Sequence, residues 1–173
     1  RSEAGSDNKI AGPIELLANS SVRILNGGSG GGKLTLQGSV DLNGFELEGE
    51  GASATHVLQI DGQITGSGGT IDKDDDFMMI LTNGANDYSG NTTVDNGVLR
   101  ITDKDALGDA NGITDINADG TLQFHNLAGG VFDAAEEIQY EGDGAGGIGA
   151  LDNSGGNTTL SASASLTMIG DAS

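Results

Sequence analysis

Apolar and polar residues alternate in short stretches that recur along this chain. Residues 32–36, 97–101 and 120–124 each read glycine, a variable residue, leucine, a polar residue and a large apolar residue, and residues 165–169 are a looser copy. In each copy the leucine and the residue two positions later share one side of a β-strand. The copies start at separations close to multiples of about 22 residues, which predicts one such strand per coil of a solenoid.

A second sequence motif recurs with the same period. Residues 90–94 read Gly-Asn-Thr-Thr-Val and return three periods later, at residues 156–160, as Gly-Asn-Thr-Thr-Leu. Thr92 and Thr158 are therefore expected at equivalent positions of coils three apart. Both motifs predict an all-β fold. The expected architecture is a parallel β-helix whose coils of about 22 residues stack through parallel strands.

The length predicts roughly eight such coils in one β-helical domain over residues 13–173, preceded by an irregular N-terminal segment, residues 1–12. Both ends would expose unpaired strand edges, which caps or neighbouring chains must cover. Asn-Gly pairs predict turns between strands, at Asn26-Gly27, Asn43-Gly44, Asn83-Gly84, Asn96-Gly97 and Asn111-Gly112. The predicted core consists of inward aliphatic and aromatic residues: Leu34, Leu36, Val40, Leu47, Leu58, Ile60, Leu99, Ile101, Leu122, Phe124, Leu160 and Leu166.

Residues 86–126 contain several motifs in an uncommon order. Residues 88–94 read Tyr-Ser-Gly-Asn-Thr-Thr-Val, residues 106–108 read Ala-Leu-Gly, and residues 120–124 read Gly-Thr-Leu-Gln-Phe. This stretch resembles the autotransporter-associated β-strand repeat, also called the passenger-associated transport repeat. Residues 156–173 resemble a degenerate second copy, with Ser154 in place of the tyrosine.

That resemblance implies a right-handed parallel β-helix in the passenger stem of a large secreted or surface protein of bacteria. The family has no catalytic residues to carry over. The chain begins at Arg1 without a methionine, and we expect it to be an excerpt of a longer, outer-membrane-anchored protein.

The charge is strongly acidic, with 26 Asp and Glu against 7 Lys and Arg and a net charge of −19. This balance argues against nucleic acids or anionic membranes as partners, because both would be repelled. No apolar stretch is long enough to predict membrane insertion of this segment. Without cysteine, disulfides and thiol chemistry are excluded.

Two acidic stretches are candidate calcium sites. Asp115, Asn117 and Asp119 alternate before Gly120, as in the opening of a calcium loop, but Asn126 stands where that loop needs a bidentate acid. The second stretch includes Asp72, Asp74 and Asp76, whose mutual repulsion a divalent ion would relieve. Solvated turns explain both stretches more simply, so we expect no cofactor and keep calcium as the alternative.

Catalysis is not expected. Aromatic residues make up 3% of the chain and there is no tryptophan, whereas enzymes that degrade polysaccharides usually hold sugars on aromatic platforms. His56 and His125 are isolated in the sequence and are expected on the surface or in turns. A polysaccharide lyase or hydrolase therefore ranks third among the functions considered.

The sequence thus favours a structural stalk, stem or fibre segment, outside the cell or on a bacterial surface. Its expected partners are other copies or neighbouring repeats of the same protein, through the open coil ends. The alternative is an adhesin or a module that binds glycans or a host surface through its acidic loops.

Overall fold

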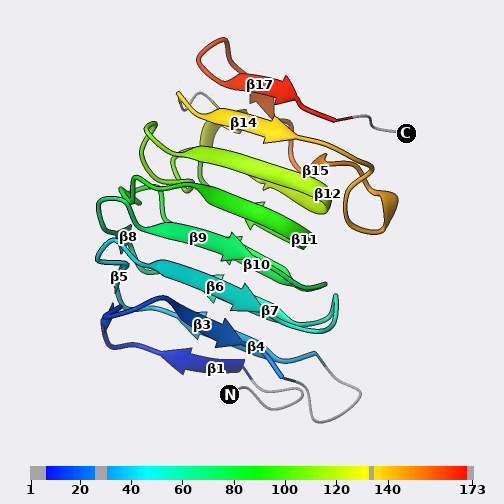
Figure 1. Ribbon diagram of the computed structural model, residues 1–173. Coiled ribbons are helices and arrows are strands. Elements are labelled where there is room, and N and C mark those ends of the chain that lie inside the picture. The colour runs from blue at the N-terminus through cyan, green and yellow to red at the C-terminus, as the bar shows by residue number, and fades with distance from the viewer. Residues whose placement is uncertain (1–6, 26–30, 133–134, 171–173) are drawn as a thin grey trace.

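The computed structural model describes residues 7–25, 31–132 and 135–170. The chain winds into a β-solenoid of parallel strands, with about six turns spaced by ~24 residues (Figure 1). The predicted fold class, a parallel β-solenoid with coils of roughly this length, is confirmed, while the predicted number of eight coils is wrong. The expected turn at Asn26-Gly27 lies outside the described residues.

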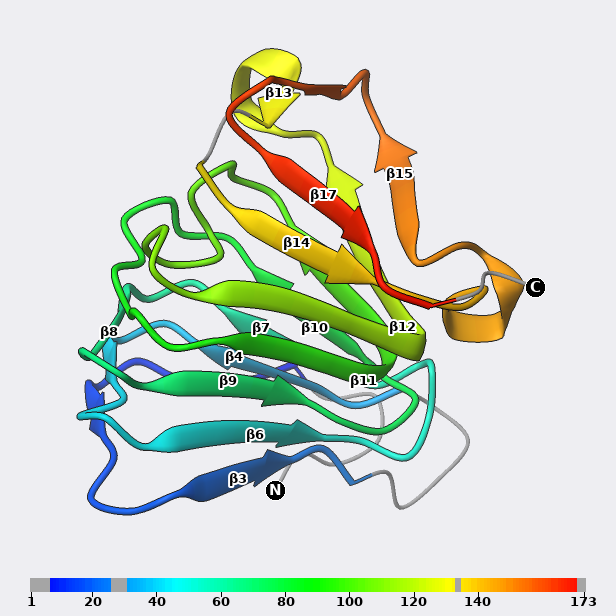
Figure 2. The same cartoon turned by 45° about the horizontal axis from the view of Figure 1, so that its top comes forward.

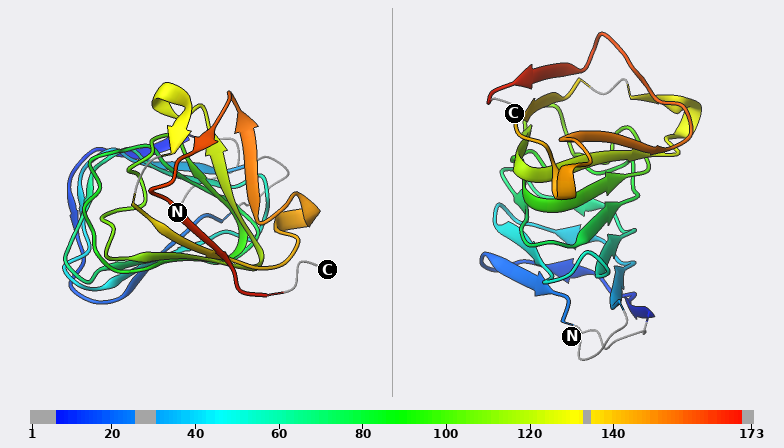
Figure 3. Two further views of the ribbon diagram at one scale, coloured as in Figure 1. Left: turned by 90° about the horizontal axis from the view of Figure 1, so that it is seen from above. Right: turned by 90° about the vertical axis from the view of Figure 1, so that its right-hand side faces the viewer.

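Three faces enclose the interior, as the axial view shows (Figure 3). Face one contains β1 (Asp7–Ile10), β4 (Lys33–Leu36), β7 (Val57–Ile60), β10 (Met78–Leu81), the C-terminal parts of β11 (Thr92–Ile101) and β12 (Ile113–His125), and β15 (Leu151–Gly155). Face two contains β3 (Ser20–Arg23), β6 (Glu46–Glu50), β9 (Thr70–Lys73), the N-terminal parts of β11 and β12, β14 (Glu137–Tyr140) and β17 (Ser165–Met168).

Face three is narrower and contains β2 (Ile14–Glu15), β5 (Val40–Asp41) and β8 (Ile64–Thr65), with a separate pair of β13 (Val131–Phe132) and β16 (Thr159–Leu160). Between these strands the Asn86 side chain continues the ladder. Its oxygen accepts a hydrogen bond from the Ile64 amide at 2.8 Å, and its nitrogen donates to the Ala106 carbonyl at 2.7 Å. Three coils are thereby connected by a buried amide.

Inward side chains stack in columns along the solenoid. On face one, Leu58 pairs with Leu34 and Met79, and Leu99 pairs with Met79 and Leu122. All of these side chains are buried, and burying one such aliphatic residue contributes ~1.5–3 kcal/mol. Each coil therefore covers the apolar surface of the coil before it.

Ten of the twelve predicted core residues are buried. The exceptions are Leu160, which is 40% exposed, and Leu166, which is half-buried. Both lie on the last described coil, where no further coil covers them. The strand at Asp7–Ile10 also corrects the expectation that residues 1–12 are irregular, since β1 pairs with β4.

The two C-terminal repeat copies do not occupy the predicted positions. Residues 165–168 form β17 on face two, paired with β14, whereas the other three copies lie on face one. Thr158 precedes β16, which pairs with β13 on face three, while Thr92 begins β11 on face two. Thr92 and Thr158 are therefore not equivalent.

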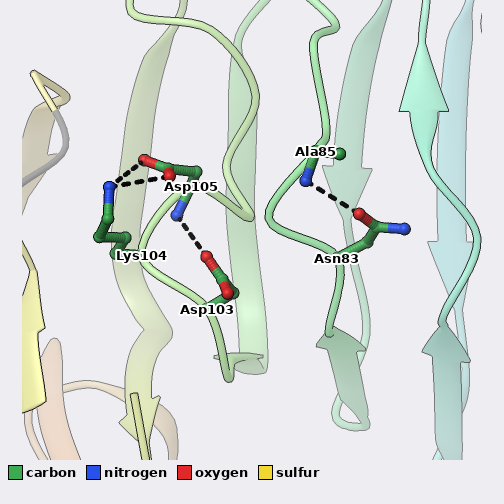
Figure 4. Close-up of polar contacts among 5 residues, drawn as sticks. All are labelled: Asn83, Ala85, Asp103, Lys104 and Asp105. Atoms are coloured by element: carbon green, nitrogen blue, oxygen red, sulfur yellow. Dashed lines mark hydrogen bonds and ion pairs between the residues drawn. The ribbon is translucent and has the colours of Figure 1, made fainter. Parts of the chain in front are cut away.

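The corner that follows face one repeats one turn geometry (Figure 4). The Asn83 side chain accepts a hydrogen bond from the Ala85 amide at 2.9 Å, and the Asp103 side chain accepts one from the Asp105 amide at 3.1 Å. These Asx turns follow β10 and β11 and redirect the chain toward face three. A Cβ at Gly84 would lie 2.2 Å from Asp103 Oδ1, so glycine allows this close stacking.

Within the parts of the chain that the structure describes, no helix has the length and apolar character that a bilayer crossing requires.

Candidate functional site

The two predicted acidic stretches lie on either side of β11, on the outer surface of face two. Thr93 pairs with Asp72 of β9 on one side and with Asp115 of β12 on the other. Asp72 also pairs with Glu48 of β6. The sequence predicted that these acids lie in turns or loops. The structure instead places Asp72 and Asp115 within strands, where their side chains face outward and the residues next to them face the core.

The remaining candidates follow at the corner beyond these strands. The Asn117 amide donates to the Asp95 carboxylate, and Asp119 pairs with Asn96. Asp74 donates its backbone amide to the Gly49 carbonyl, and Asp76 is exposed ahead of β10. The structure thus places the two stretches at β9 and β12, which flank β11 on opposite sides.

Two carboxyl groups of face two, those of Asp72 and Glu48, have raised pKa values. Burial, together with the negative charges of Asp95, Glu46 and Glu48, raises the pKa of Asp72 to about 6. The pKa of Glu48 is raised by desolvation and by Glu50. Asp72 and Glu48 therefore bind protons more readily than isolated carboxylates would.

Among the described residues, no group of three or more His, Cys, Asp or Glu is placed to hold a metal ion. Asp72 and Asp115 are two strand spacings apart, about 10 Å, whereas calcium binds its oxygens at about 2.3–2.6 Å. One ion cannot bridge these two carboxylates directly. Buried Oδ1 atoms of both residues have no hydrogen-bond partner, and calcium binding remains a prediction.

Lys73 differs from the surrounding acids because its side chain points into the core and is fully buried. Its ammonium donates to the backbone carbonyls of Asn96 at 2.5 Å, Asp75 at 2.7 Å and Asp74 at 3.2 Å. Burial lowers the pKa of Lys73 to about 7, against the attraction of the neighbouring aspartates. Sequence reasoning missed this role, since Lys73 reads as one more charged residue of an acidic run.

A second buried polar cluster crosses three coils. The Tyr88 and Thr92 hydroxyls are hydrogen-bonded at 2.7 Å, Thr92 pairs with Thr114 on the next rung, and the Thr114 hydroxyl donates to Glu136 Oε1 at 2.7 Å. Burial raises the pKa of Glu136 to about 7, against the hydrogen bond from Thr114. The tyrosine and threonine of the repeat motif thus form buried hydrogen bonds inside the solenoid.

The histidines occupy two different environments. His56 is 3% exposed and both ring nitrogens lack partners, so the expected surface position is wrong for this residue. The turn position is confirmed, because the His56 amide donates to the Ser53 carbonyl at 2.8 Å and closes a turn. His125 lies half-buried, with Nδ1 2.9 Å from Ser154 Oγ and Nε2 3.1 Å from the Asn126 amide nitrogen. Which ring nitrogen donates in these two contacts depends on the tautomer of the imidazole.

Comparisons with family models, with curated proteins and with solved structures found no match for this chain.

Proposed function

We propose that this chain is a structural segment, a stalk, stem or fibre piece of a bacterial secreted or cell-surface protein. The observation that supports this is the continuous interior column of face one, in which Met79 pairs with Leu58 of the coil before it and with Leu99 of the coil after it. Load applied along such a stack is shared by parallel ladders and by one uninterrupted core. The chain would act as a rigid spacer and not as an enzyme.

Folding of such a chain would also assist export. Each coil that emerges from a membrane can pair with the coil already folded and bury its apolar residues against it. Addition of coils outside the membrane is then favourable at every step, and it opposes backward movement of the chain. Cysteine is absent from the sequence, so this folding needs no disulfide formation.

The proposal includes end-to-end contact with copies or neighbouring repeats. The strand order of the main sheet begins at β1 and ends at β17, and each of these strands has one partner in the described chain. Met168 on β17 is 59% exposed and Ile10 on β1 is 42% exposed. A docked coil would pair with these edges and cover these side chains.

Light scattering behind a sizing column tests this association as a function of protein concentration, with and without about 1 mM calcium. We expect mass to rise with concentration, and Met168→Lys to prevent the rise, while Gln59→Lys in the middle of the solenoid leaves it unchanged. If the mass rises only when calcium is present, the contact between molecules would be assigned to the acidic residues. A monomer under every condition contradicts self-association.

The spacer role itself is tested by pulling single chains from both ends. A load-bearing segment should resist extension as one body and then lose coils only at forces above those that unfold an ordinary globular control domain. Coils that peel off at lower forces than the control would contradict a stalk function.

A further inference from the structure

A groove lies on the outer surface of face one, beside the loop that carries the short helix η2 (Ala145–Gly147). Its volume is about 640 Å³, within the range of ordinary ligand sites. Met78 and Val98 line it from the strands, Gly146 and Ile148 from the loop, and Asp76 and Asp119 from the corner. Figure 2 shows this loop projecting from the body of the solenoid.

The floor of the groove is apolar. Met78 and Val98 are paired residues of β10 and β11, and they face outward because the following residues, Met79 and Leu99, are fully buried in the core. Ile148, on the loop that leads into β15, adds an isoleucine that is 50% exposed. These three side chains give the groove its apolar floor.

The wall formed by the η2 loop is held in place before any ligand binds. The Ala145 amide donates to Thr121 Oγ1 at 2.9 Å, and the Thr121 hydroxyl donates to the Gly149 carbonyl at 2.8 Å. A third bond joins the Gly144 amide to the Ala118 carbonyl at 3.1 Å. Binding at such a preformed wall costs little conformational entropy.

The rim of the groove is negatively charged. Asp76 and Asp119 are exposed, and Asn96 lies opposite Asp119 on the neighbouring rung. The nearby Lys73 ammonium is fully buried and donates to three backbone carbonyls, including that of Asn96, so it offers no exposed cation to these carboxylates. The rim therefore suits a cationic group from a ligand.

We propose that this groove binds an extended peptide segment of a partner protein in which Lys or Arg flanks an aliphatic residue. The aliphatic side chain would cover Met78 and Val98 beside Ile148, while the cation pairs with Asp119 or Asp76. Apolar contact supplies affinity, and the carboxylates supply orientation and selectivity for basic over acidic segments. This binding function is separate from the spacer role of the solenoid.

Fluorescence anisotropy at physiological ionic strength tests the proposal with a fluorescein-labelled peptide of alternating lysine and leucine. Two comparison peptides replace every leucine by glycine or every lysine by glutamate. We expect the lysine–leucine peptide to bind at least about tenfold more tightly than either. Equal binding of the lysine–glycine peptide would overturn the proposal, because the apolar floor would then contribute nothing.

Two matched pairs of variants locate the site. Asp119→Lys should weaken binding about tenfold, whereas Glu15→Lys, the same change of charge sign at an exposed position on face three, should change it less than twofold. Val98→Thr should weaken it about threefold, and Val57→Thr, on the same face outside the groove, should not.

Thermal melts establish that each variant folds, and Asp76→Asn replaces Asp119→Lys if the latter does not. Equal weakening by Asp119→Lys and Glu15→Lys would mean that the peptide responds only to the net charge of the protein, and the groove assignment would be rejected.

Discussion

The Lys73 ammonium lies 3.9 Å from the centre of the Phe77 ring, in the interior corner between faces two and one. Lys73 pairs with Gly49 of β6 on one side and with Val94 of β11 on the other. A Cβ at Gly49 would lie 2.3 Å from the Met79 side chain, so the glycine provides room for the aromatic and methionine side chains of the next coil. A buried cation is stabilised here by an aromatic face and by backbone carbonyls.

Lys73→Met should destabilise the solenoid at neutral pH by about 2 kcal/mol, because the carbonyls of Asp74, Asp75 and Asn96 lose their donor. Urea denaturation followed by circular dichroism measures this change. Lys9→Met, at a side chain that is 53% exposed, should alter stability by less than about 0.5 kcal/mol. If Lys73→Met leaves the protein as stable as the wild type, relief from desolvation fully offsets the lost hydrogen bonds and contradicts the prediction.

Glu136 should make stability depend on pH. Its pKa is raised from 4.5 to about 7 by burial, so the folded state holds a proton that the unfolded state releases. The stabilisation is fully present below pH 4.5 and is lost as the pH rises to about 7. Glu136→Gln keeps an acceptor for Thr114 without the charge, and we expect it to be more stable than the wild type by roughly 1 kcal/mol at pH 8 but not at pH 4.5.

Denaturation of both proteins at the two pH values measures this difference. Glu137→Gln is the matched control, since the neighbouring side chain is exposed and the change of net charge is the same. If both variants gain equally at pH 8, relief of the overall negative charge explains the effect and the buried carboxyl does not.

Tyr88→Phe should cost about 1–2 kcal/mol, because the Thr92 hydroxyl loses its hydrogen-bond partner inside the core. Tyr140→Phe, at a half-buried position of face two, serves as the control and should be nearly neutral. Differential scanning calorimetry of the two variants compares them directly. Equal melting temperatures would show that the Tyr88–Thr92 bond adds nothing to stability.

The sequence predicted the parts of the fold that depend on local pattern. Residues 32–36, 97–101 and 120–124 all contribute strands to face one, because alternation sets the inward side and the period sets the face. The C-terminal copies were misplaced because corner loops vary in length. Leu122 pairs with Leu151, with the η2 loop inserted between them, so counting multiples of about 22 residues no longer identifies the face.

The sequence predicted which acidic residues belong to the candidate site, but not how the site is arranged in space. Asp72 and Asp115 alternate with buried isoleucines, and this alternation predicts outward positions on strands. Lys73 breaks the expectation that an inward residue is apolar. Part of the space for its ammonium comes from Gly97, where a Cβ would lie 2.8 Å from Lys73 Nζ, and one of its three acceptors is the Asn96 carbonyl. Both residues belong to the next coil, and no local pattern joins them to Lys73.

Glycines that turn the chain from face one to face three are stacked on one another, and the sequence analysis missed them. Gly12, Gly38 and Gly62 each follow an inward Ile or Leu by two residues. A Cβ at Gly62 would lie 1.8 Å from the Gly38 carbonyl oxygen, while one at Gly12 would have no atom within 4 Å. Gly62→Ala should therefore cost about 3 kcal/mol or more through displaced backbone, and Gly12→Ala should be tolerated. Thermal denaturation of the two alanine variants tests this difference, and similar losses in both would exclude close coil stacking as the cause.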